Sequence, residues 1–173
     1  MPSRSDQIAS KGMGIAKAVK ATAKGIVGVF KTLMEQHGEV SALIRRVQKD
    51  AGKRADLWPQ IRRELLSHER GELRVVYPAL RERAETRELA DRHDAEATSL
   101  EGQIAAVDQE PTDSTAWAEA FDRLVELVQA HVTFEENEVF PAAMAALGDN
   151  RARALAAPFV EAKLAEVNRV DRH

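Results

Sequence analysis

The feature that most constrains this chain is an ungapped internal repeat built around histidine and glutamate. Residues 68–78 and 131–141 both read H-x-x-x-E-x-x-x-V-[YF]-P. A further histidine precedes each copy of the repeat: His37 precedes the first copy, and His93 precedes the second. Each of these histidines lies four residues after a leucine. The chain therefore reads as two copies of one helical hairpin. A bundle with pseudo-two-fold symmetry would bring the two sets of polar side chains face to face.

Helical periodicity runs through nearly the whole sequence. Apolar residues recur at about 100° per residue, the spacing of an amphipathic α-helix. We expect Gly148 to end the fourth helix and Pro158 to break the fifth. The five predicted helices span about 10–49 (or a later start), 56–80, 82–107, 113–147 and 151–170.

Four main helices joined by short loops predict an all-α fold. The expected architecture is an up-down-up-down four-helix bundle over residues 30–147. Residues 1–29 would form a basic, amphipathic helical extension, and residues 148–173 a tail with a short helix. The tail is expected to pack against the bundle or against a second subunit, so an oligomer is compatible with the sequence.

Composition limits the chemistry that this bundle can carry. Aromatic residues make up only 5% of the chain, which argues against an all-β sandwich or barrel. The net charge of −3 gives no electrostatic reason to expect nucleic-acid binding. Cysteine is absent, which excludes disulfides, thiolate metal sites, iron–sulfur clusters and cysteine nucleophiles. Any bound metal must therefore have nitrogen and oxygen ligands.

Histidine and glutamate recur on the apolar faces of all four main predicted helices. Side chains spaced three or four residues apart share one face of a helix, which here points into the bundle. A buried carboxylate costs several kcal/mol unless it is paired or binds a metal. We therefore interpret these residues as a metal site rather than as separate core residues. The candidate ligands are His37, His68, Glu72, His93, His131 and Glu135.

Imidazole and carboxylate ligands without thiolate suit iron, manganese or zinc. A histidine and a glutamate four residues apart lie one turn apart, so the imidazole can bind one metal while the carboxylate bridges to a second. Six ligands exceed the need of one tetrahedral zinc ion but suit two octahedral ions with open positions. The sequence therefore favours a dinuclear centre. A bundle with one zinc ion, or with no metal, is the simpler alternative.

The pattern His37, His68-x-x-x-Glu72, His93, His131-x-x-x-Glu135 resembles the hemerythrin-like, or HHE cation-binding, domain family over about residues 30–147. Members of that family hold two non-haem iron ions, bridged by two carboxylates and an oxo or hydroxo group, inside a four-helix bundle. The resemblance implies that the two glutamates bridge the irons and that the four histidines are terminal ligands.

One position departs from the pattern of the oxygen-carrying members of that family. They have a further histidine four residues after the third one, where this chain has Ala97. One iron would then lack a protein ligand, which leaves an exchangeable site or recruits a substitute. Glu96 and Glu69 are the candidate substitutes, and the single tyrosine, Tyr77, is a more distant one. A more open centre fits redox turnover or sensing better than reversible oxygen carriage.

Such a centre is compatible with functions of different classes. The chain could bind O2, peroxide or nitric oxide, or turn one of them over as an enzyme. It could instead sense iron or oxygen, or hold iron, and act through a protein partner. Only about thirty N-terminal residues lie outside the predicted bundle, which favours a stand-alone binding or redox protein over a sensor with an output domain.

The N-terminal segment is basic and has no acidic residue from position 7 to 34. Its lysines rule out a membrane span or a signal peptide, so a cytoplasmic location is expected. Packing on the bundle is the simpler role for this segment, but an anionic membrane surface or a partner protein remains open. His173, the fifth histidine, is expected to be solvated. The lysines are Lys17, Lys20, Lys24 and Lys31.

Overall fold

The computed structural model describes residues 3–170, which are helical almost throughout and contain no strand. The all-α prediction is confirmed, and no helix in this range is long and apolar enough to cross a bilayer. His173 lies outside the described residues. The long helices are α1 (Arg4–Ala23), α2 (Gly28–Lys49), α3 (Arg54–Arg81), α4 (Ala84–Asp108), α5 (Thr115–Phe134), α6 (Phe140–Ala154) and α7 (Ala156–Val170).

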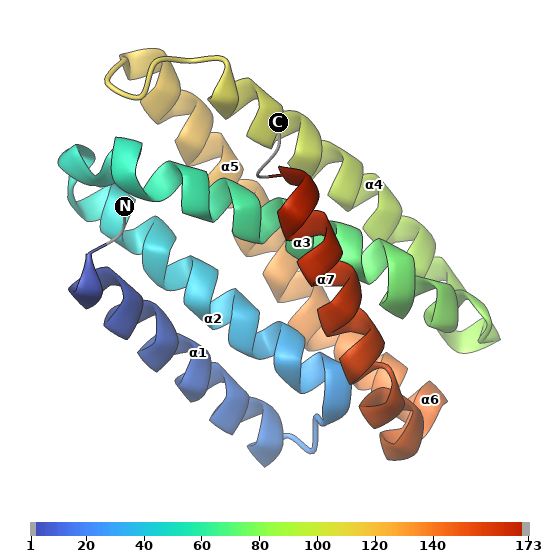
Figure 1. Cartoon of the computed structure of the whole chain (residues 1–173). Helices are drawn as coiled ribbons and strands as arrows, with labels where there is room; N and C mark the ends of the chain where they lie inside the picture. The colour runs from blue at the N-terminus through green and yellow to red at the C-terminus, as the bar shows by residue number, and fades with distance from the viewer. Residues whose placement is uncertain (1–2, 171–173) are drawn as a thin grey trace.

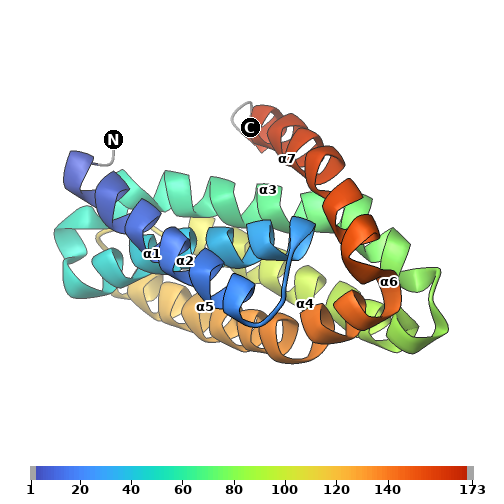
Figure 2. The same cartoon turned by 90° about the horizontal axis from the view of Figure 1, so that it is seen from below.

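Helices α2, α3, α4 and α5 lie side by side and form the bundle (Figure 1). A 3-10 turn, Ala51–Lys53, precedes α3, and a π-helical segment, η2 (Glu135–Val139), joins α5 to α6. α6 follows α5 through this segment, and the two other helices, α1 and α7, lie outside the bundle. α1 packs against α2, whereas α7 packs against α3 and α2 (Figure 2).

The apolar core is divided into two clusters at different levels of the bundle. One cluster contains Ile61, Leu100 and Trp117. The other contains Phe30 and Phe140 and extends to α7. Full burial of each such side chain contributes about 1.5–3 kcal/mol to stability. The polar residues of the repeat are therefore enclosed between two well-packed apolar regions.

The prediction of one helix over about 10–49 is wrong. The chain turns back between α1 and α2, where Gly25 and Gly28 have φ angles of 72° and 59°. Glycine adopts this left-handed region without steric cost, and a helix cannot continue through it. One continuous helix would place the apolar Ile15 and Val19 on the same inward face as Phe30 and Leu33. In the separate helix α1 they are 58% and 65% exposed.

In the last two helices the structure differs from the sequence prediction at one proline. Gly148 has non-helical φ and ψ angles of 74° and 166° and kinks α6, where the end of a helix was predicted. Pro158 does not break the next helix, so that prediction is wrong. It lies in the first turn of α7, where a backbone N–H has no partner within the helix.

α1 and α2 are in direct backbone contact at two glycines. A Cβ atom on Gly38 would lie 2.5 Å from the carbonyl oxygen of Met13 and 2.9 Å from the Cα atom of Gly14. Two helix backbones can pack this closely only at glycine, which has no side chain. Near the start of α1, the buried Asp6 carboxylate pairs with Arg46. The extension is therefore an integral part of the packed structure.

Replacing Gly38 by alanine is expected to lower the free energy of unfolding by about 1–3 kcal/mol, the range for overpacked sites. The new methyl group would collide with the backbone of Met13. Gly12→Ala is the matched control, because a Cβ there meets nothing within 4 Å. That control should gain about 0.5–1 kcal/mol from losing a helix glycine. Urea unfolding measures both, and equal shifts would contradict the packing described.

Candidate metal centre

The middle of the bundle holds a buried group of imidazoles and carboxylates. Each of the helices α2, α3, α4 and α5 contributes one histidine, and no histidine of the group is more than 7% exposed. α3 adds two glutamates, and the third is the first residue of η2. The residues are His37, His68, Glu69, Glu72, His93, His131 and Glu135.

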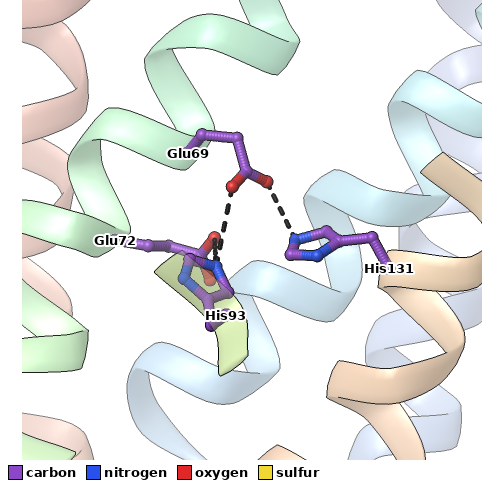
Figure 3. A group of neighbouring side chains, drawn as sticks. All are labelled: Glu69, Glu72, His93 and His131. Atoms are coloured by element: carbon purple, nitrogen blue, oxygen red, sulfur yellow. Dashed lines mark ion pairs between the residues drawn. The ribbon is translucent and has the colours of Figure 1, made fainter. Parts of the chain in front are cut away.

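Four of these side chains form a first group: Glu69, Glu72, His93 and His131, each with a ligand atom within 4.8 Å of the others. Glu69 lies between the two histidines (Figure 3). One of its carboxylate oxygens is 2.9 Å from Nε2 of His131, and the other is 3.6 Å from Nε2 of His93. The arrangement has the ligand types and spacing of a site for one metal ion.

His37, His68 and Glu135 form a second group that meets the same 4.8 Å limit. The Nε2 atoms of the two histidines face each other at 3.3 Å. Nε2 of His37 is also 3.1 Å from Oε2 of Glu135. Two imidazole nitrogens and one carboxylate thus converge on a second point.

Two glutamates reach both groups. Oε2 of Glu72 is 3.3 Å from Nε2 of His68 and 3.8 Å from Nε2 of His93. Glu135 lies beside His37 of the second group, and its oxygens are also 3.5 and 3.6 Å from Nε2 of His93 and of His131. Each carboxylate is therefore placed where it can bridge two ions.

Several polar atoms of the buried group make no well-aligned hydrogen bond within the described part of the chain, which indicates whether these residues could hold a metal ion. Buried polar atoms in proteins nearly always have a hydrogen-bond partner. Here seven buried atoms form no well-aligned hydrogen bond among the described residues: Oε2 of Glu69, both oxygens of Glu72, both ring nitrogens of His93, Nε2 of His131 and Oε2 of Glu135. Three of these atoms, Nε2 of His131 and Oε2 of Glu135 and of Glu72, nevertheless lie 2.9, 3.1 and 3.3 Å from an ion-pair partner. Metal ions would satisfy most of these atoms, so the donor set fits a nitrogen- and oxygen-ligated centre.

Without metal, the histidines divide into two kinds. Burial by itself lowers the pKa of an imidazole. At His37 and His131, however, nearby carboxylates that include Glu135 outweigh burial. They raise the pKa of His37, and they raise the pKa of His131 well above its ordinary value. Burial prevails at the other two, lowering the pKa of His68 well below its ordinary value and also lowering that of His93. A metal ion must therefore displace protons from part of the group.

The two bridging candidates also differ in charge state. Burial, followed by the nearby Glu135 and Glu69, raises the pKa of Glu72 well above its ordinary value. Burial would raise the pKa of Glu135 too, but His131 and His37 hold it well below its ordinary value. The metal-free chain therefore favours one protonated and one ionised carboxylate at the centre.

Three histidines are oriented through their second ring nitrogen. Nδ1 of His37 is 3.0 Å from Glu136, Nδ1 of His68 is 2.9 Å from Gln36, and Nδ1 of His131 is 3.1 Å from Glu96. Such outer partners fix ring orientation at metal sites. Glu96 thus lies on the far side of its histidine and belongs to neither ligand group, whereas Glu69 lies inside the first.

Tyr77 and Ala97 occupy the space around His93. The tyrosine ring stacks on the imidazole with centroids 3.4 Å apart. Its hydroxyl donates a 2.6 Å hydrogen bond to Oε1 of Glu135. Ala97, one helical turn after His93, is buried and has no side-chain atom that could bind a metal ion. The structure therefore places Tyr77 as a donor to a carboxylate of the group.

Sequence reasoning missed Glu136, which is buried and pairs with both His37 and Lys17 of α1. In a regular α-helix this residue would be turned about 100° away from its neighbour Glu135. The π-helical segment changes the register, so that three consecutive side chains from Phe134 onward are buried. Pro141 does not predict this segment, because Pro78 holds the equivalent position in the first copy of the repeat and lies inside the regular helix α3. π-Bulges are frequent at functional sites.

The sequence of this chain matches one known protein family. The family model of the hemerythrin HHE cation-binding domain matches residues 28–143, more than half of the chain. The chain belongs to this family. The match begins with α2 and ends early in α6, so the HHE domain contains every residue of the two ligand groups, while α1 and α7 are additions. Searches of curated proteins and of solved structures found no match.

Proposed function

We propose that this HHE protein binds two non-haem iron ions inside an up-down-up-down four-helix bundle. One observation carries the proposal: two ligand groups share two buried carboxylates, and seven polar atoms there form no well-aligned hydrogen bond among the described residues. A single ion would leave one of the groups unsatisfied. Membership of a cation-binding family supports the same conclusion.

Each residue has a distinct role in this proposal. Glu72 and Glu135 would bridge the ions, and the four histidines would be terminal ligands. Glu69 would complete the first group in place of the histidine absent at position 97. Tyr77 holds one oxygen of Glu135 by its hydrogen bond, which limits rotation of that carboxylate.

Bound iron would supply a redox-active centre that binds O2, peroxide or nitric oxide. The protein contributes the enclosure, because the ligand groups are buried between two apolar clusters that exclude water. With both bridges counted, the ion beside His37 and His68 would have four protein ligands, and the ion beside Glu69, His93 and His131 would have five. The exchangeable position for the small ligand therefore belongs to the ion beside His37 and His68.

Sensing through a partner is the second candidate function, and one chain of contacts favours it. Lys17 of α1 pairs with Glu136, and Glu136 is 3.0 Å from Nδ1 of His37. The outer face of the same helix exposes Ile15 and Val19. A change at the metal could thus reach a surface that is free to contact another protein.

Elemental analysis of protein purified without added metal tests the proposal. We expect about two irons per chain, with near-ultraviolet bands of a bridged ferric pair after exposure to air. The double variant His68→Ala, His131→Ala should lose both ions, because it removes a ligand from each group. Glu138→Ala is the control, since this neighbouring glutamate side chain is 56% exposed. About one zinc per chain, or unchanged iron in the double variant, would contradict a di-iron centre.

A further inference from the structure

A small cavity adjoins the ligand groups on the side of α7. Its volume is about 20 Å³, and about 10–15 Å³ is enough for one water molecule. The inner wall contains His37, His68, Glu69 and His131, which come from both ligand groups. A molecule in this cavity would therefore lie directly beside the proposed metal centre.

The remaining walls of the cavity are mainly aliphatic. Five valine or leucine side chains line it, among them Leu65, Leu100 and Val128. Such walls give no hydrogen bonds to replace the hydration of an ion, so they favour an uncharged occupant. Size and lining together suit a diatomic molecule.

α7 closes the outer side of this cavity and is fixed at both ends. Phe159 packs into a notch on α3, where a Cβ atom on Gly71 would lie 3.0 Å from its ring. One turn beyond the cavity, the buried Glu166 pairs with Arg74 of α3 at 3.4 Å. The stretch of α7 between these two anchors is thereby held over the bundle.

Lys163 lies between the two anchors and lines the cavity itself. Its Nζ donates hydrogen bonds of 2.8 Å to the side chains of both Gln36 and Glu64. Gln36 in turn is the partner of Nδ1 of His68. The ammonium group thus ties α7, α2 and α3 together across the cavity, and its side chain is only 13% exposed.

We propose that Lys163 controls entry to the cavity, and that the charges of the rim around it make the cavity selective for an uncharged diatomic ligand. The inference rests on the proposed function, because the ligand binds at the metal centre. Two carboxylates, Glu39 and Glu64, share the outer rim with Lys163. The rim therefore carries one net negative charge that opposes small anions, while the lysine closes the path until its hydrogen bonds open.

Two variants break the same ion pair with opposite changes in charge. Lys163→Met makes the rim more negative, and Glu64→Gln makes it neutral. Both should speed the association of nitric oxide with the ferrous iron-loaded chain about threefold, a factor typical of a partly exposed ion pair. The association of azide with the ferric form should follow charge instead: relative to nitric oxide, it should fall in Lys163→Met and rise in Glu64→Gln. Stopped-flow absorbance measures all of these rates.

Glu101→Gln is the matched control, because it breaks the Arg70–Glu101 pair of α3 and α4, neither member of which lines the cavity. Rates that match those of the unmodified protein in both variants would overturn the role of Lys163, as would equal changes for both ligands. Iron content measured beforehand separates the two proposals. A chain that takes up no iron contradicts both, whereas an iron-loaded chain with an unchanged azide-to-nitric-oxide ratio contradicts only the role of Lys163.

Discussion

Replacing Glu69 by alanine is expected to reduce the iron content from about two ions per chain to about one, because the first group then loses the one carboxylate of the described ligand groups that it does not share with the second. Glu69 lies between His93 and His131, at 3.6 and 2.9 Å. Glu135 also approaches both histidines, at 3.5 and 3.6 Å, but it is shared with His37. His93 and His131 would then depend on carboxylates that the second group also uses, so their ion should bind weakly. The second group keeps all three of its ligands, so the remaining ion should be retained. Iron per chain after dialysis against a weak chelator measures the difference.

Glu96→Ala is the matched comparison for this variant. Glu96 is also hydrogen-bonded to His131, but through Nδ1 on the side away from the ligand groups. Its loss should leave about two irons per chain and weaken the affinity by about 10–100-fold, the usual effect of removing an outer partner. If Glu96→Ala loses an ion while Glu69→Ala keeps both, the roles assigned to these two glutamates are reversed.

The helices and the four histidines could be predicted because both depend on local spacing. The repeat placed His68 and His131 at equivalent positions, and the 3.6-residue period placed their neighbours on the same inward faces. The turn between α1 and α2 escaped prediction for a physical reason. Gly25 and Gly28 lie in an apolar pattern that continues on both sides, and glycine is compatible both with a helix and with a left-handed turn.

The distinction between Glu69 and Glu96 depends on tertiary structure. Glu96 shares a helix face with His93, whereas Glu69 is turned about 100° from His68. Glu69 is nevertheless buried, because its carboxylate lies between His93 of α4 and His131 of α5. Glu96 approaches His131 from the other side, and its side chain stays 25% exposed. The apolar periodicity of a single helix therefore cannot predict which of the two glutamates belongs to a ligand group.

The stability of the metal-free chain depends on the same buried carboxylates. Burial, with Glu135 and Glu69 nearby, raises the pKa of Glu72 well above its ordinary value. A carboxyl group whose pKa is raised by folding contributes its full stability below the pKa of the unfolded chain, and this stability is lost as the pH rises through the folded pKa. The metal-free protein should therefore become less stable toward neutral and alkaline pH, where Glu72 is forced to ionise beside other carboxylates.

Glu72→Gln is accordingly expected to make the metal-free chain more stable at neutral pH, by about 1–4 kcal/mol, the range for replacing buried charged groups with neutral ones. The amide resembles the protonated acid, so the decline of stability with pH should also flatten. The same variant should bind less iron, because the amide cannot bridge two cations as a carboxylate does. Urea unfolding of chelator-treated protein across the pH range measures both effects, with the exposed Glu138→Gln as control. A metal-free variant that is less stable than the unmodified chain at neutral pH would show that Glu72 serves the fold rather than the metal.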